Sequence, residues 1–262
     1  MDAVSLSRHI AGGGTPAAAW RADPALANVA QVDLAQLVAP GARLVVVAPH
    51  PDDEILPCGG LLHLLAQRAV LDPDAAAPLV VAVTDGEGSH PGSDDWPQAR
   101  LRQVRPVETA AALAALGLTW PPITRLGIPD GGVSGAEDSL ARRLASIIRP
   151  GDVVLTTWRH DGHPDHEATA RACARACRER GARMLEAPVW GWHWSSPEQQ
   201  AMPFARAVKL ALPPGVVSRK RAALACFHSQ ITADASTGAA PIVPAFAIER
   251  IINPFELYFH AA

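Results

Sequence analysis

The chain has 262 residues, of which 48% are hydrophobic and 19% are charged, and its formal net charge is -3. This composition is typical of a globular protein with a large apolar core, and it excludes extended disorder. The 23 Lys and Arg residues are scattered among 26 Asp and Glu residues, so we expect no nucleic-acid partner. The length fits a single α/β domain over residues 1–262.

Short apolar segments alternate with amphipathic ones over residues 43–180, which we expect to form the core. Residues 1–40, rich in Ala, Gly and Pro, predict an irregular N-terminal arm with room for one short helix. The alternation predicts a Rossmann-like α/β fold, with a mostly parallel sheet and helices on both faces. The expected strands are 43–48, 79–84, 123–128 and 152–157, and the expected helices are 54–69, 98–117, 137–149 and 165–180.

Prolines and a later Trp-rich segment complicate this pattern. Pro106 is expected to break or begin a helix.

Residues 182–262 suggest strands near 183–190 and 205–212, a helix near 217–228 and a Pro-rich tail, and we expect this part to shape specificity. Trp190, Trp192 and Trp194 alternate as on one face of a strand, where they would stack on a sugar ring or pack against the sheet. His228 could cap a pocket.

The cysteines and the N-terminus bear on the compartment. Cys58, Cys173, Cys177 and Cys226 show no disulfide framework spacing and are expected to be buried thiols in a reducing environment. No basic start followed by a sustained apolar run is present, so we expect neither a signal peptide nor a transmembrane segment. A cytoplasmic protein is the resulting expectation, and the sequence allows a homo-oligomer.

Two loops rich in His and Asp follow predicted strands. Residues 49–54 read Pro-His-Pro-Asp-Asp-Glu, and residues 160–166 read His-Asp-Gly-His-Pro-Asp-His. Ligands of open α/β sheets bind where strands end, at the carboxyl edge. His50, Asp53 and His166 could therefore face one point as three protein ligands, leaving positions open for water as in catalytic zinc sites. Zn²⁺ is the expected cofactor, although Fe²⁺ could use the same ligands.

The neighbouring polar residues fit a hydrolytic role. A bound metal lowers the pKa of its water toward ~7, and Asp52 is the candidate base that takes the proton. His163 could stabilise the oxyanion or protonate the leaving group. Asp165 could accept a ring N–H and fix the tautomer of a histidine. Glu87 and Asp130 follow the second and third strands, where they could border the pocket and bind sugar hydroxyls, or form plain turns that need no function.

These motifs resemble the PIG-L/LmbE-like family of metal-dependent N-acetylglucosaminyl deacetylases. The resemblance covers about residues 43–180. It implies a Rossmann-like fold, zinc on His50, Asp53 and His166, Asp52 as general base, and His163 as the stabilising or protonating group. It also implies that Arg105 holds substrate. The motifs that carry it are 49–54 followed by Cys58-Gly59-Gly60, Thr84-Asp85-Gly86-Glu87, Arg105 with Glu108 before Leu116-Gly117, 126–131 (Leu-Gly-Ile-Pro-Asp-Gly), and His163-Pro164-Asp165-His166.

The sequence thus predicts a zinc-dependent hydrolase that removes an acetyl group from the amide nitrogen of an N-acetylglucosamine-like sugar or glycoconjugate. An amidase of a non-sugar natural-product intermediate would use the same residues. Non-haem iron enzymes share the ligand set but normally have β-rich scaffolds. A nucleotide-binding Rossmann protein is disfavoured, because the loop after the first strand lacks a G-x-G-x-x-G motif and carries acids that would repel a pyrophosphate. A non-enzymatic module with a structural metal is also compatible with the sequence.

Overall fold

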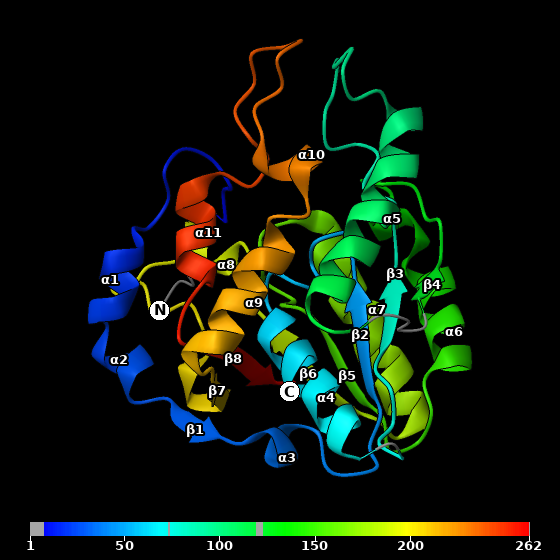
Figure 1. Cartoon of the computed structure of the whole chain (residues 1–262), viewed down its shortest axis with the longest axis vertical. Helices are drawn as coiled ribbons and strands as arrows, with labels where there is room; N and C mark the ends of the chain where they lie inside the picture. Colours follow the sequence, from blue (N-terminus) through cyan, green and yellow to red (C-terminus); the bar gives the residue numbers. More distant parts are fainter. Residues whose placement is uncertain (1–7, 73, 119–122, 262) are drawn as a thin grey trace, which may run out of the picture.

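The computed structural model describes residues 8–72, 74–118 and 123–261, and an eight-stranded sheet runs through this part of the chain (Figure 1). The strand order is β1-β7-β8-β6-β5-β2-β3-β4. β8 is antiparallel to both of its neighbours, and the other neighbouring strands run parallel. The strands are β1 (Ala30–Val32), β2 (Leu44–Ala48), β3 (Leu79–Ala82), β4 (Ile123–Arg125), β5 (Val153–Thr157), β6 (Arg183–Ala187), β7 (Ala207–Ala211) and β8 (Phe255–His260).

Helices cover both faces of this sheet. In Figure 1, α4 (Gly59–Leu71), α5 (Gln98–Ala115) and α9 (Pro214–Leu224) lie in front of the sheet, and α7 (Pro164–Arg180) lies behind it next to α6 (Glu137–Ile147). Strand β2 is buried at every position because its alternate side chains enter different cores. Leu44 and Val46 belong to the core with α4, and Val45 and Val47 to the core with α7. The expected Rossmann-like fold is confirmed.

The shorter elements lie mainly toward the two ends of the chain. Residues 1–7 of the expected N-terminal arm lie outside the described residues. The remaining elements are the helices α1 (Ala17–Ala22), α2 (Pro24–Ala27), α3 (Leu34–Leu37), α8 (Gly191–Trp194), α10 (His228–Ile231) and α11 (Ala245–Ile251) and the short 3-10 helices η1 (Val133–Ala136) and η2 (Phe204–Arg206).

Two predictions about helices were inaccurate in different ways. The helix expected at 54–69 begins at Gly59, because residues 51–58 form turns that contain Pro57. Pro106 neither breaks nor begins a helix but lies inside α5. A proline there leaves the carbonyl of Arg102, four residues earlier, without its helical N–H donor. Arg125 Nη2 lies 3.5 Å from that oxygen and donates to it instead, which offsets part of the cost.

The expected irregular arm and Trp ladder were also wrong. β1 lies inside the expected arm and pairs with β7, over 170 residues later in the chain, which no local pattern reveals. Trp190 precedes α8 and Trp192 and Trp194 lie within it, so the three indoles do not share a strand face. The tail also contains α11 and β8, whereas the strand expected near 205–212 is present as β7.

A buried ion pair connects β8 to α9, next to the start of α4. Glu256 Oε1 lies 2.7 Å from Lys220 Nζ, and both side chains are almost completely buried. The same carboxylate accepts the N–H groups of Gly60 and Leu61, the first turn of α4, and the hydroxyl of Tyr258. The carboxylate therefore satisfies orphan donors at the N-terminus of α4, which follows the His- and Asp-rich residues 50–54 after one further stretch of turn.

Glu256→Gln should lower the free energy of unfolding by about 3–5 kcal/mol, because it leaves Lys220 buried without its counter-charge. Urea denaturation followed by circular dichroism measures the change. Glu249→Gln is the matched control: Glu249 pairs with Arg21 at the surface, with side chains 60% and 53% exposed, and its loss should cost less than about 1 kcal/mol. Equal effects of the two substitutions would contradict the assigned role of Glu256.

Candidate metal centre

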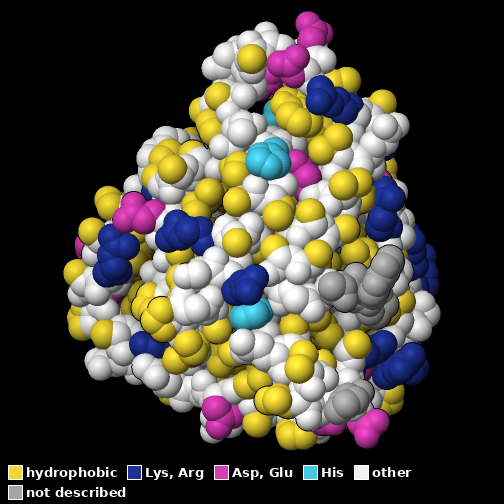
Figure 2. Space-filling model, viewed as in Figure 1, with side chains coloured by type: hydrophobic (Ala, Val, Ile, Leu, Met, Phe, Trp, Pro, Cys, Tyr) yellow, Lys and Arg dark blue, Asp and Glu magenta, His cyan; other side chains and the backbone are white. Residues whose placement is uncertain are grey.

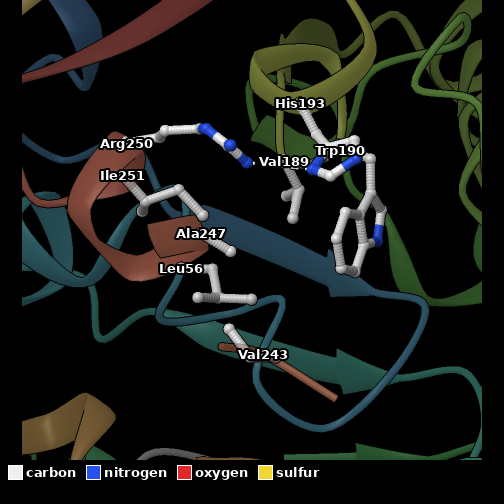
Figure 3. Close-up of a pocket in the computed structure, with 8 residues that line it drawn as sticks. All are labelled: Leu56, Val189, Trp190, His193, Val243, Ala247, Arg250 and Ile251. Carbon is white, nitrogen blue, oxygen red and sulfur yellow. Dashed lines mark hydrogen bonds between the residues drawn. The ribbon is translucent and has the colours of Figure 1, made fainter. Parts of the chain in front are cut away.

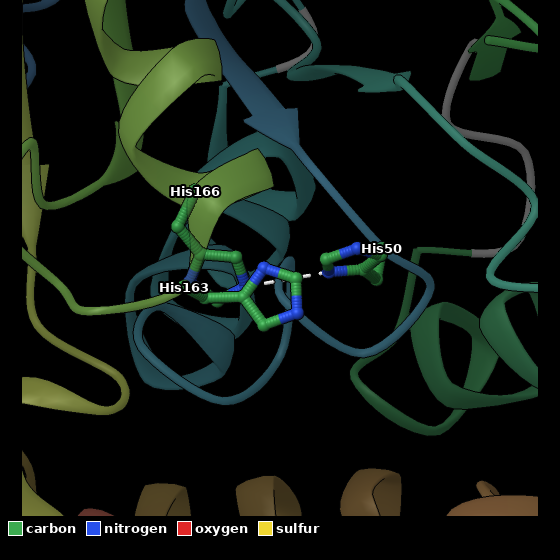
Figure 4. Close-up of side chains that lie close together, drawn as sticks. All are labelled: His50, His163 and His166. Atoms are coloured by element: carbon green, nitrogen blue, oxygen red, sulfur yellow. Dashed lines mark hydrogen bonds between the residues drawn. The ribbon is translucent and has the colours of Figure 1, made fainter. Parts of the chain in front are cut away.

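The two His- and Asp-rich loops leave neighbouring strands at the point where the sheet topology reverses. From β2 the chain passes to β3 and β4 on one side, and then returns to β5 on the other side of β2. β2 and β5 are paired in parallel, with Val47 opposite Thr156, so their carboxyl ends lie side by side. Open α/β sheets bind ligands at such switch points. His50 therefore comes to lie beside the start of α7, which carries His163 and His166 (Figure 4).

Three potential ligand atoms converge between these loops. His50 Nδ1 lies 3.3 Å from His166 Nε2, and Asp53 Oδ2 lies 3.3 Å from the first nitrogen and 3.2 Å from the second. Bonds of about 2.0–2.2 Å in a tetrahedral arrangement separate neighbouring ligand atoms by roughly 3.4 Å, so the spacing fits a zinc-sized ion. His50, Asp53 and His166 are all buried.

Each ring has a carboxylate beside its outer nitrogen, the one that faces away from the three converging atoms. These carboxylates favour the tautomer that leaves a lone pair on the inner nitrogen. Asp161 Oδ2 lies 2.8 Å from His166 Nδ1, and Asp130 Oδ1 and Asp165 Oδ2 lie 3.1 and 3.4 Å from His50 Nε2. Because an ionised carboxylate only accepts, the hydrogen bond to Asp161 puts a proton on His166 Nδ1, and the two carboxylates beside His50 Nε2 favour a proton on that nitrogen. The inner nitrogens of the neutral rings are then bare and face each other and Asp53, an arrangement that requires a cation between them.

The charges at this centre also favour a cation between the ligand atoms. Burial acts to lower the pKa of His166, but Asp53 and Asp161 outweigh it and raise the pKa to about 9. Burial likewise opposes the charged form of Asp53, yet the adjacent histidines hold the pKa of this carboxyl well below its usual range. Without a metal, the site therefore retains protons on its imidazoles. A metal ion would replace that positive charge.

Among the described residues, two other groups of side chains are close enough together to hold a metal: His50 with His163 and His166, and His50 with Asp130 and Asp165. The second group surrounds the outer nitrogen of His50. Its carboxylates already accept backbone N–H groups, Asp130 from Gly88 and Asp165 from Gly131. Asp130 and Asp165 therefore already have partners within the protein, and this favours the inner side of the ring as the place for an ion.

Asp52 is held in a strained backbone conformation beside the converging atoms. Its φ angle is 122°, a region that costs of order 1–3 kcal/mol for a residue with a side chain. Glu54 Oε2 accepts its N–H at 3.0 Å, and Arg105 Nη2 lies 3.3 Å from Asp52 Oδ2. Burial raises the pKa of Asp52 to about 8, although the Arg105 guanidinium acts in the opposite direction. Such a carboxyl group can take up and release a proton near neutral pH.

His163 has a different setting from the other two histidines. It caps the N-terminus of α7, where its Nδ1 accepts the N–H of Asp165 at 3.2 Å, ahead of Pro164 in the first turn. The neutral ring must therefore carry its proton on Nε2. Burial and the two neighbouring histidines lower the pKa of His163 to about 4. The ring is partly exposed, and it borders the cleft beside His166.

These groups line one cleft of about 450 Å³. His50, Asp52, Asp53, His163 and His166 form its polar floor together with Arg105 and Asp130. The other wall is largely apolar, and next to it lies a small cavity whose lining includes Arg250 and His193, shown in Figure 3. The apolar residues that line the cleft are Ile10, Leu56, Val189, Trp190, Ile242 and Val243.

The rim of the cleft includes two projecting loops. The loop before α5 and the loop between α10 and α11 project together at the top of Figure 1, and Ser236 Oγ lies 3.1 Å from Ser93 Oγ. Among the described residues visible in Figure 2, Lys and Arg side chains are scattered and separated by other types, so this face offers no broad basic patch. Among the described residues, no helix is both long and apolar enough to span a bilayer.

Two of the expected substrate ligands are already engaged with the protein. Arg105 is buried and donates to the carbonyl oxygens of Gly86 and Pro51 as well as contacting Asp52. Glu87 Oε1 lies 3.1 Å from Arg102 Nη2 and accepts the N–H of Asp130 at 3.4 Å. The structure places both side chains as supports of the loops around the cleft, and their contact with substrate stays a prediction.

Sequence reasoning gave no role to Asp161, which the structure connects to the site. Besides His166, its carboxylate accepts the N–H groups of Val189, Trp190 and Gly191. The only local signal was its place in the loop between His160 and His163. Its backbone partners follow β6, so the role depends on a contact across the sheet.

The fold and site define a class: an α/β protein with a buried His–Asp metal-binding group at the switch point of its sheet. The family model described as PIG-L, GlcNAc-PI de-N-acetylase, matches residues 45–177, half of the chain. The chain therefore belongs to the PIG-L family, which confirms the family expected from the motifs.

Curated relatives match only part of the chain. A Bacillus cereus protein named probable N-acetyl-alpha-D-glucosaminyl L-malate deacetylase 2 is 30% identical over 141 residues, 51% of this chain and 60% of that protein. A Mycolicibacterium gilvum protein named 1D-myo-inositol 2-acetamido-2-deoxy-alpha-D-glucopyranoside deacetylase is 29% identical over 206 residues, 67% of this chain and 66% of that protein. The chain thus spans less than two thirds of the length of these relatives.

Solved structures share the fold at low identity. A teicoplanin deacetylase in a zinc-inhibited form has a TM-score of 0.58 and 22% identity, covering 73% of this chain and 85% of its own. An A40926 pseudoaglycone deacetylase has a TM-score of 0.55 and 21% identity, covering 85% and 99%. A 4-carboxy-2-hydroxymuconate hydratase of Pseudomonas putida has a TM-score of 0.53 and 21% identity, covering 72% and 80%. The fold alone therefore does not fix the reaction.

Asp161→Asn should weaken zinc binding by roughly 10- to 100-fold, the usual effect of losing a carboxylate that orients a ligating histidine. Competition against a chromophoric zinc chelator measures the affinity, and circular dichroism checks folding. Asp138→Asn, at an exposed aspartate paired with Arg175, is the matched control and should bind zinc like wild type. Equal zinc affinity of the Asp161 variant and wild type would show that this carboxylate does not orient His166.

Proposed function

We propose that this protein is a zinc-dependent N-deacetylase that removes an acetyl group from the amide nitrogen of an N-acetylglucosamine-like sugar or glycoconjugate. The observation that carries the proposal is the convergence of His50 Nδ1, Asp53 Oδ2 and His166 Nε2 beside the buried carboxyl group of Asp52. The relatives named as deacetylases of N-acetylated sugar conjugates support the choice of substrate. The cytoplasmic location expected from the cysteines stays a prediction.

The residues divide the work between holding a metal and moving protons. When bound by His50, Asp53 and His166, zinc would supply Lewis acidity toward an acyl oxygen and lower the pKa of a water. Asp52 lines the same cleft, and its raised pKa suits it to take a proton from the attacking water. Arg105 fixes the direction of the Asp52 carboxyl group, because its own guanidinium is held by two backbone oxygens.

His163 is the proposed donor on the other side of the reacting centre. Its Nδ1 is occupied by the N–H of Asp165, which directs the remaining ring proton to Nε2. That N–H suits stabilisation of a developing oxyanion. Passing a proton to the leaving amine would require the imidazolium form, which the lowered pKa of His163 and the N–H of Asp165 at Nδ1 oppose. The proton that Asp52 takes from water could instead pass to the leaving amine. The cleft of about 450 Å³ is wide enough for a sugar ring with a substituent.

Asp52→Asn should reduce kcat for acetate release by about 10²–10⁴-fold, because the amide cannot accept the proton of water. Zinc content should stay near that of wild type, since Asp52 is not one of the three converging ligands. Acetate release from phenyl glycosides of N-acetylglucosamine, followed with a coupled enzymatic assay, measures the rate.

His50→Ala is the contrasting variant and should lose zinc and activity together. His228→Ala, on α10 and outside the converging ligands, is a histidine control that should retain zinc. An Asp52→Asn enzyme that turned over at the wild-type rate would remove Asp52 as the base. Wild-type protein that binds zinc and yet releases no acetate from any acetamido sugar would contradict the proposed deacetylase.

A further inference from the structure

Gln230 presents an unusual polar group on the wall of the cleft. Its side chain is only 1% exposed, and it lines the cleft together with Asp52 and Val243. Among the described residues, its carboxamide oxygen Oε1 has no hydrogen-bond partner. A buried acceptor without a partner costs about 1–3 kcal/mol. A substrate donor that paired with this oxygen would remove that cost.

The direction of this carboxamide is set by two neighbours. Glu108 accepts both the N–H of Ser229 at 2.8 Å and its hydroxyl at 2.6 Å. The hydroxyl proton is therefore used on the carboxylate, which leaves the Ser229 oxygen as an acceptor. Gln230 Nε2 lies 2.8 Å from that oxygen and must be the donor. The reverse orientation would bring two acceptors together, so Oε1 is the end that lacks a partner.

The backbone holds Gln230 in place as well. Its carbonyl accepts the N–H of Val243 at 2.9 Å, and Phe227 accepts the N–H of Gln230. Gln230 and Asp52 also line a small cavity of about 10 Å³ beside the cleft. Gln230 and the candidate base Asp52 therefore line the same two hollows, the cleft and this small cavity.

We propose that Gln230 is a specificity-determining residue whose carboxamide oxygen accepts a hydrogen bond from a neutral N–H or O–H donor of the substrate. The donor lies on the part of the substrate that carries the acyl amide: the amide N–H itself or a neighbouring sugar hydroxyl. This role of Gln230 rests on the proposed function and adds the substrate group that the protein would recognise. Glu108 and Ser229 act through Gln230 as positioning residues.

The test compares substrate preference in wild type and Gln230→Leu, which keeps side-chain bulk and removes the acceptor. The probes are phenyl N-acetylglucosaminide, its three monodeoxy analogues and its N-methylacetamide analogue. In zinc-loaded wild type, loss of the matching donor should lower kcat/KM roughly tenfold. Gln230→Leu should be roughly tenfold slower on the parent compound and show no further loss with that one analogue. The analogue that loses its penalty identifies the donor as the amide or as one hydroxyl.

Two further variants separate recognition from folding. Gln199→Leu changes an exposed glutamine and should keep the wild-type preference throughout. Ser229→Ala removes the oxygen that orients the carboxamide and should weaken the same preference. This variant keeps the test decisive if Gln230→Leu does not fold. Zinc content and the urea unfolding midpoint are measured for every variant.

The outcomes distinguish this inference from the proposed function. If wild type releases no acetate from the parent compound, the deacetylase proposal fails and the assumed substrate class fails with it. If wild type is active but the folded Gln230 and Ser229 variants keep the wild-type ratio for every analogue, the deacetylase stands and the role of Gln230 is overturned. A uniform loss of rate, equal for all probes, is likewise the result of a purely structural residue.

Discussion

The inward convergence of two imidazole lone pairs and one carboxylate oxygen is the constraint on which the rest of the site depends. Such an arrangement is stable only with positive charge between the three atoms, and only if the outer nitrogens are held protonated. Asp161 and Asp130 meet that second condition, and backbone N–H groups hold each of these carboxylates in turn. The electrostatics of the centre therefore extend through several loops of the sheet edge.

This extension explains why residues remote in sequence shape the cleft. Asp161 follows β5, but its backbone partners at 189–191 follow β6 and carry Trp190 into the apolar wall. The N-terminal segment is fastened to the same region, because Arg250 donates to Thr15 O and lies 2.9 Å from His193 Nδ1. Metal centre and apolar wall are thus parts of one hydrogen-bonded arrangement. Loops that are positioned by a rigid sheet are where function is normally carried.

The sequence predicted the parts of this arrangement that local patterns encode. Buried runs such as residues 43–48, the amphipathic segments between them and the two His- and Asp-rich loops place the core strands, their helices and the clustered site residues. β1 and Asp161 were missed because their roles depend on partners far along the chain. Pro106 was misread for a related reason: Arg125, which relieves the freed carbonyl, comes from a neighbouring strand.

Gln230 shows the same limit at the level of a single atom. Its residue type and its place after Ser229 are visible in the sequence, but the direction of its amide follows only from the chain of donors and acceptors that begins at Glu108. The fold is shared with a protein named as a hydratase, so the scaffold does not select the reaction. The reaction and its substrate must instead be selected by groups on the cleft wall that still have capacity to form hydrogen bonds. Asp52 would supply that capacity for proton transfer, and Gln230 for recognition.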